Sequence, residues 1–148
     1  MTRAVIVGLG QPAAGDDGVG LLVARVLAGR GHDTRESADA SILLALLDDQ
    51  RRIVVVDAVV DGGVPGTVLE LDAGALASGP TPLSSHGLGV AEALEIARTL
   101  YGAQALAGVH IVGVAIDRPA RAMLGLSPAV AAAVEPAAVL AAALAVAG

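Results

Sequence analysis

A small set of side chains able to bind a metal or move a proton stands at strand ends and helix starts. Asp16 and Asp17 open a predicted helix, Asp57 follows the apolar run Ile53 to Val56, and His86 ends a Gly/Pro/Ser-rich stretch. Ligands of an open α/β sheet gather beyond the carboxyl ends of its strands. Two carboxylates and one imidazole, with open positions, suit a divalent transition metal. We therefore predict that Asp17, Asp57 and His86 bind one metal ion.

Each of these residues also has a simpler interpretation. A carboxylate at a helix start is stabilised by the free amides and the helix dipole, by roughly 0.5 to 2 kcal/mol. One such cap accounts for one aspartate, and Asp16 is the better placed to cap or support the loop, which leaves Asp17 for the metal. Asp57 alone could accept hydrogen bonds from its own turn, and His86 alone could be a surface or capping histidine. Their combination at loop ends favours the metal site.

The glycine-rich first loop, from Gly8 to Gly20, invites comparison with phosphate-binding motifs, and the comparison fails. A dinucleotide fingerprint needs its third glycine where Ala13 stands, and a P-loop needs Lys followed by Ser or Thr. Asp16 and Asp17 would repel a phosphate at the helix start. A serine nucleophile beside His86 is also disfavoured, because the chain has no Gly-x-Ser-x-Gly elbow.

Composition bounds the class of protein. The chain has 148 residues, a length that suits one domain over residues 1–148. Its net charge is −6 and its nine basic residues form no stripe, so nucleic-acid binding is not expected. Without cysteine, a metal must be bound by carboxylate and imidazole. The apolar run after Arg3 is too short for an export signal, and we expect a cytoplasmic protein.

The elements that position the site alternate between strand and helix. Strands are predicted at Ala4 to Val7, which we expect to be the central one, at His32 to Glu36, Ile53 to Val56, Thr67 to Leu71 and Val109 to Ile116. The first helix carries the apolar stripe Val19, Leu22, Val23, Val26 and Leu27; a second carries Ile42, Leu43, Leu46 and Leu47; a third, with His86 at its start, carries Val90, Ala93, Leu94, Ala97 and Tyr101. This order predicts a three-layer α/β/α sandwich with a mainly parallel central sheet.

Two segments need separate treatment. Gly74 to Ser85 is predicted to be a long loop. Ser127-Pro128 should begin a last helix, which Pro136 should kink or split. Its tail approaches membrane-spanning length, but spanning needs roughly 20 strongly apolar residues and a central carboxylate costs about 3 kcal/mol, so Glu135 favours packing on a soluble core.

With these motifs in place, the chain resembles the hydrogenase maturation endopeptidases, the nickel-dependent proteases that trim the large subunit of nickel–iron hydrogenases. The likeness is carried by several segments in the family's order: Gly8-Leu9-Gly10, Gly15-Asp16-Asp17-Gly18-Val19-Gly20, Val56-Asp57-Ala58, Pro65-Gly66-Thr67, Ser85-His86-Gly87-Leu88, Val112-Gly113-Val114, Gly125-Leu126-Ser127-Pro128 and Glu135-Pro136.

The resemblance implies an α/β/α fold and a metal bound by Asp17, Asp57 and His86, which agrees with the reading of the residues. It implies nickel, supplied at least partly by the substrate, with other divalent metals able to substitute. It also implies that the enzyme removes the C-terminal extension of a nickel–iron hydrogenase large-subunit precursor after nickel insertion. Gln11, Asp16 and Asp39 are the residues we expect to contact this substrate.

Two other functions stay open at this point. The family usually has Asn where Gln11 stands and an Asp-Gly-Gly-Thr segment where this chain reads Glu36-Ser37-Ala38-Asp39. The altered segment leaves room for a non-catalytic module that binds or escorts the same nickel-bearing precursor. A nucleotide-binding domain rests only on the order of strand, glycine loop and helix.

Overall fold

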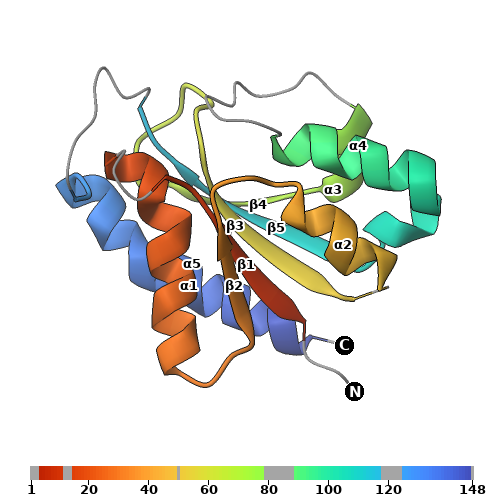
Figure 1. Cartoon of the computed structure of the whole chain (residues 1–148). Helices are drawn as coiled ribbons and strands as arrows, with labels where there is room; N and C mark the ends of the chain where they lie inside the picture. Colours follow the sequence, from red (N-terminus) through yellow and green to blue (C-terminus); the bar gives the residue numbers. More distant parts are fainter. Residues whose placement is uncertain (1–3, 12–14, 50, 79–88, 118–124, 148) are drawn as a thin grey trace.

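A five-stranded sheet forms the middle layer of the protein (Figure 1). The computed structural model describes residues 4–11, 15–49, 51–78, 89–117 and 125–147. The strands are β1 (Val5–Leu9), β2 (Thr34–Ser37), β3 (Ile53–Val59), β4 (Val68–Leu71) and β5 (Val109–Ala115). They lie in the order β2-β1-β3-β5-β4, all parallel except β4, which is antiparallel to β5. The mainly parallel sheet is therefore confirmed.

The helices cover both faces of this sheet. They are α1 (Val19–Gly29), α2 (Ile42–Asp48), α3 (Ala73–Ser78), α4 (Val90–Tyr101) and α5 (Pro128–Val146), with two short 3₁₀ helices, η1 (Gly15–Gly18) and η2 (Ala103–Leu106). Figure 1 shows α1 and α5 on one face and α2 and α4 on the other. This is the predicted α/β/α sandwich.

The middle of the sheet is β3, not β1. The run Ile53 to Val56 is fully buried because helices cover both of its faces. The strand also runs further than predicted: it continues through Asp57 to Val59, since Asp57 pairs with Gly113 of β5. On its other side the pairing with β1 stops at Val56. Asp57 thus lies just beyond the last residue of β3 that pairs with β1, at a position still paired with β5.

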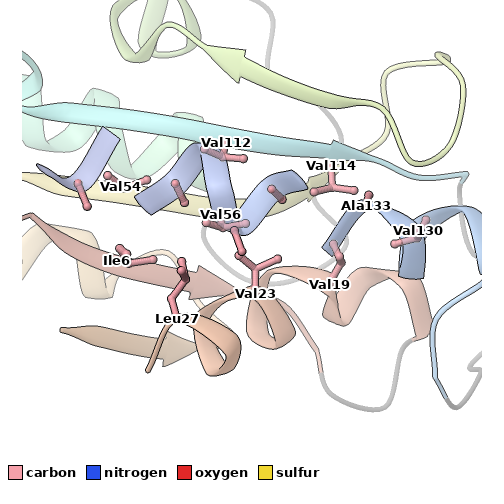
Figure 2. Close-up of a cluster of buried hydrophobic side chains, with 14 of the residues drawn as sticks. Ile6, Val19, Val23, Leu27, Val54, Val56, Val112, Val114, Val130 and Ala133 are labelled. Atoms are coloured by element: carbon pink, nitrogen blue, oxygen red, sulfur yellow. The ribbon is translucent and has the colours of Figure 1, made fainter. Parts of the chain in front are cut away.

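Two aliphatic cores fill the space between the sheet and the helices. Figure 2 shows the core beneath α1 and α5, where Val19 and Val23 approach Val56 and Val114 of the sheet. The second core, beneath α2, α3 and α4, contains Val55 of the sheet with the leucines and alanines of these helices. Because residues alternate along a strand, Ile53, Val55 and Asp57 all face this second core. On this face of β3, Asp57 is the polar side chain that follows the apolar side chains of Ile53 and Val55.

The buried face of α1 differs from the predicted stripe. Leu22 is 36% exposed, whereas Gly20 and Ala24 are buried together with Val19, Val23 and Leu27. Leu21 is buried as well, so the predicted Val19, Val23 and Leu27 are confirmed as buried, whereas Leu22 is not. Apolar periodicity alone missed Gly20 and Ala24, because glycine and alanine are only weakly hydrophobic.

Two further predictions were wrong in part. Ala73 to Ser78 forms α3 instead of loop, and the Asp72 carboxylate accepts a hydrogen bond of 2.8 Å from the Ala75 amide at its start. The rest of that predicted loop, and His86, lie outside the described residues. Likewise α4 buries Ala93, Leu94 and Ala97 as predicted but leaves Tyr101 exposed.

Helix α5 runs unbroken over 19 residues, so Pro136 does not split it. Pro136 is exposed, as is Ala132 one turn before it, and the carbonyl that the proline cannot pair can face water. By length and hydropathy α5 is the one helix in the described part of the chain that could cross a membrane. It buries a row of alanines, among them Ala137 and Ala141, in the core beneath α1 and α5.

Candidate active site

Close backbone packing of glycines brings the first loop against the central strand. A Cβ atom added at Gly20 would lie 2.3 Å from the carbonyl oxygen of Val56 and 2.4 Å from that of Leu9. One added at Gly8 would lie 2.3 Å from the carbonyl oxygen of Gly20, and one at Gly10 the same distance from that of Asp17. No side chain fits at these positions. The glycines therefore set the distance between η1 and the end of β3.

Asp57 is a half-buried carboxyl group at this junction. Its Oδ1 accepts a hydrogen bond of 2.9 Å from the Ala58 amide. Burial, and then the neighbouring charge of Asp17, raise the pKa of Asp57 to about 8, against a smaller lowering effect of the Ala58 hydrogen bond. The structure thus brings Asp17 and Asp57 together, as the strand-end argument predicted. A protonated carboxyl, or a cation between the two, relieves the repulsion.

The neighbouring carboxylate, that of Asp16, has its hydrogen-bond partner at the start of α5. Its two carboxylate oxygens accept hydrogen bonds from the Ser127 amide, at 2.6 Å, and from the Ser127 hydroxyl, at 2.8 Å. Ser127 is the N-cap of α5 and makes no capping bond with its own side chain. Asp16 does not cap α1 either, because the N-cap of that helix is Gly18. Asp16 supports the loop, as expected, but through a residue 111 positions away that sequence reasoning did not identify.

The predicted substrate-contacting residues also lie at this edge. Gln11 follows Gly10, whose amide donates a 3.1 Å hydrogen bond to the carbonyl of Ser37 at the end of β2. Asp39 lies two residues beyond Ser37, and its Oδ1 accepts a hydrogen bond of 2.8 Å from the Ser41 amide, where α2 begins. Gln11 and Asp39 therefore follow the carboxyl ends of the neighbouring strands β1 and β2. Their contact with a substrate stays a prediction.

The predicted histidine ligand, His86, lies outside the described residues. The described residues resume at Gly89, the N-cap of α4. Helix α4 packs on the face of the sheet that carries the side chains of Ile53, Val55 and Asp57. Figure 1 shows this end of α4 towards the carboxyl ends of the parallel strands. The other two histidines, to which we assigned no role, lie elsewhere along the chain: His110 is inside β5 and His32 precedes β2.

The donor chemistry of the described residues fits a divalent cation. Residues 4–11, 15–49, 51–78, 89–117 and 125–147 contain no group of three His, Asp or Glu side chains placed to hold a metal. They do contain the half-buried Asp17–Asp57 pair, in which the charge of Asp17 opposes ionisation of Asp57. Two carboxylates supply two of the ligands that such an ion needs, and a third residue would complete a facial set.

Comparison with known proteins identifies the family. A model of the hydrogenase maturation protease family, HycI, matches residues 38–144. Protein FrxA of Pyrococcus furiosus is 30% identical over 108 residues, which are 71% of this chain and 78% of FrxA.

Solved structures agree with this result. The [NiFe] hydrogenase maturation protease HybD of Thermococcus kodakarensis has 26% identity and a TM-score of 0.72, over 97% of this chain and 99% of HybD. The maturating endopeptidase HybD of E. coli shares the fold at 24% identity, with a TM-score of 0.68 over 94% of this chain and 89% of that protein. The chain belongs to the hydrogenase maturation protease family.

Proposed function

We propose that this protein is an endopeptidase that removes the C-terminal extension of a nickel–iron hydrogenase large-subunit precursor after nickel insertion. The single observation that carries the proposal is the Asp17–Asp57 pair at the carboxyl edge of the sheet, in a member of the hydrogenase maturation protease family. Carboxyl groups whose pKa is raised by burial together with a specific charged neighbour cluster at functional sites. The pair is where we expect the chemistry.

Asp17, Asp57 and His86 are the residues that would hold the metal. A divalent ion bound there would polarise the scissile carbonyl or lower the pKa of an attacking water. The nickel of the precursor belongs to the substrate, and its recognition at this edge would ensure that only a loaded precursor is cut.

The protein's own contribution is to hold two carboxyl groups in place before the substrate arrives. The backbone of Asp57 is held by the hydrogen-bonded pairing of β3 with β5. Asp17 is held by the one-turn helix η1, and glycines allow the first loop and the start of α1 to pack closely against the end of β3. Groups positioned in advance contribute most to catalysis, because no reorganisation is needed during the reaction.

The test is incubation of the purified protein with a nickel-loaded large-subunit precursor, followed by intact-mass spectrometry. The wild type should shorten the precursor by one fixed C-terminal segment, and Asp57→Ala and His86→Ala should leave it at full length. His32→Ala is the matched control for the histidine, since His32 lies before β2 and outside the site.

Two outcomes would overturn the proposal. If the variants at Asp57 and His86 produce the same C-terminus as the wild type, the site is not where cleavage occurs. If the wild type binds the loaded precursor and leaves its mass unchanged, the protein is the non-catalytic escort module instead.

A further inference from the structure

The Asp16–Ser127 contact joins the loop that carries Asp17 to the first turn of the last helix. Both carboxylate oxygens of Asp16 are used, at 2.6 and 2.8 Å, and the contact is partly buried. Hydrogen bonds to a charged acceptor are about twice as strong as neutral ones, and a paired geometry adds directional restraint. We propose that Asp16 and Ser127 are positioning residues that hold Asp17 in register with Asp57, an inference that rests on the proposed function for its catalytic meaning.

The segment that carries Asp17 needs an external restraint. It contains three glycines, at positions 15, 18 and 20, and Gly15 adopts a positive φ of 57°. Glycine leaves the backbone free to take many conformations, so a short glycine-rich turn has little stiffness of its own. The N-cap of α1, Gly18, contributes no side-chain capping bond. A bidentate contact from Asp16 to a long helix restrains the residue directly before Asp17.

The same turn of α5 also holds the connection that follows Asp57. Gly66 lies between β3 and β4 with φ of 89°, and a Cβ atom added there would lie 2.5 Å from the carbonyl oxygen of Ala129. The Gly66 amide donates a 2.8 Å hydrogen bond to the Ala115 carbonyl at the end of β5. Ser127 therefore holds the segment that carries Asp17, and Ala129 lies against the connection that follows β3. The start of α5 adjoins both segments, while Asp57 itself is held by the pairing of β3 with β5.

A metal-free measurement tests the restraint itself. Hydrogen–deuterium exchange should show at least about tenfold faster exchange of the amides of Gly15 to Gly18 in Asp16→Ala, because both hydrogen bonds are lost and the loop opens locally. Ser127→Ala keeps the amide bond and loses the hydroxyl bond, so the increase in exchange should be smaller. Ser127→Thr keeps the amide and the hydroxyl and should restore protection. Arg30→Ala is the matched control: it removes the 2.6 Å Arg30–Glu135 contact, another tie to α5, and should leave the exchange of these amides unchanged. Unchanged exchange in both Asp16→Ala and Ser127→Ala would overturn the proposal.

The kinetic measurement separates positioning from stability. With the nickel-loaded precursor, Asp16→Ala should lower kcat by about 10- to 100-fold, the usual effect of losing a residue that orients a metal ligand. Ser127→Ala should lower kcat by less, because the Ser127 amide still binds Asp16. KM should stay near the wild-type value, and Ser127→Thr should recover kcat. A kcat that falls only in proportion to the unfolded fraction, measured by circular dichroism on the same samples, would contradict positioning. If the wild type fails to cleave, the proposed function fails, while the exchange experiment still decides whether the restraint exists.

Discussion

Replacing Asp57 with asparagine should make the folded protein more stable at neutral pH, although it removes a residue of the site. In the folded protein the Asp57 pKa is raised from 3.8 to about 8 by burial and by the charge of Asp17. The unfolded chain ionises this carboxyl near 3.8, so between these values the unfolded state binds fewer protons than the folded state. Wild-type stability is therefore lost as pH rises through this window. Asparagine cannot ionise and keeps an oxygen to accept the Ala58 hydrogen bond, which avoids the loss.

The size of the effect follows from linkage. Each pH unit between the two pKa values corresponds to about 1.4 kcal/mol. From about pH 5 to pH 7, the free energy of unfolding of Asp57→Asn minus that of the wild type should grow by about 2 to 3 kcal/mol, and it should level off above about pH 8. This is a large share of the roughly 5 to 15 kcal/mol that stabilises an ordinary domain.

Urea unfolding followed by circular dichroism, in a chelating buffer at a series of pH values, measures this difference. Asp49→Asn is the matched control, because it makes the same change of residue type at an exposed position at the end of α2, away from the site. A difference between Asp57→Asn and the wild type that stays flat over about pH 5 to pH 7 would refute the reasoning. A fall with pH would reverse its sign.

Three further substitutions test the framework around the site by the same unfolding assay. Gly20→Ala should cost about 3 kcal/mol, because its Cβ would lie 2.3 Å from the carbonyl oxygen of Val56; Gly29→Ala, with nothing within 4 Å, should be neutral or stabilising, and equal effects would contradict the packing argument. Asp72→Ala should cost about 1 kcal/mol through loss of the cap of α3, whereas no change would show that the cap contributes nothing. Leu94→Ala should lower the free energy of unfolding by about 2 to 5 kcal/mol, because the Leu94 side chain of α4 is fully buried. A loss below about 1 kcal/mol would indicate a core that collapses around the cavity.

The fold was predictable where burial and periodicity agree. Ile53 to Val56 is apolar at every position because both faces of β3 are covered, and this run predicted a strand of a parallel sheet. The same logic placed Asp57 at the carboxyl edge near the first loop. Its strand continues two residues beyond Asp57 because pairing with β5 overrides the low strand propensity of aspartate. The sequence around Asp57 does not show that β5 will pair with it.

The parts that sequence did not predict depend on contacts between distant segments. Gly20 reads as a weak helix residue, yet it is buried because two backbones approach it. Asp16 reads as a helix cap, yet its partner is Ser127 at the far end of the chain. The signal available for both was the likeness of their segments to motifs of one family, which indicates that a residue matters without giving its contact.

The most direct test of the central claim combines the first prediction with the proposed activity. Asp57→Asn should be folded, and more stable than the wild type at pH 7, so loss of activity in this variant cannot be attributed to unfolding. With a nickel-loaded large-subunit precursor, intact-mass spectrometry should show removal of one C-terminal segment by the wild type and a precursor of full length with Asp57→Asn. A precursor trimmed to the same C-terminus by both proteins would contradict the assignment of Asp57 to the active site.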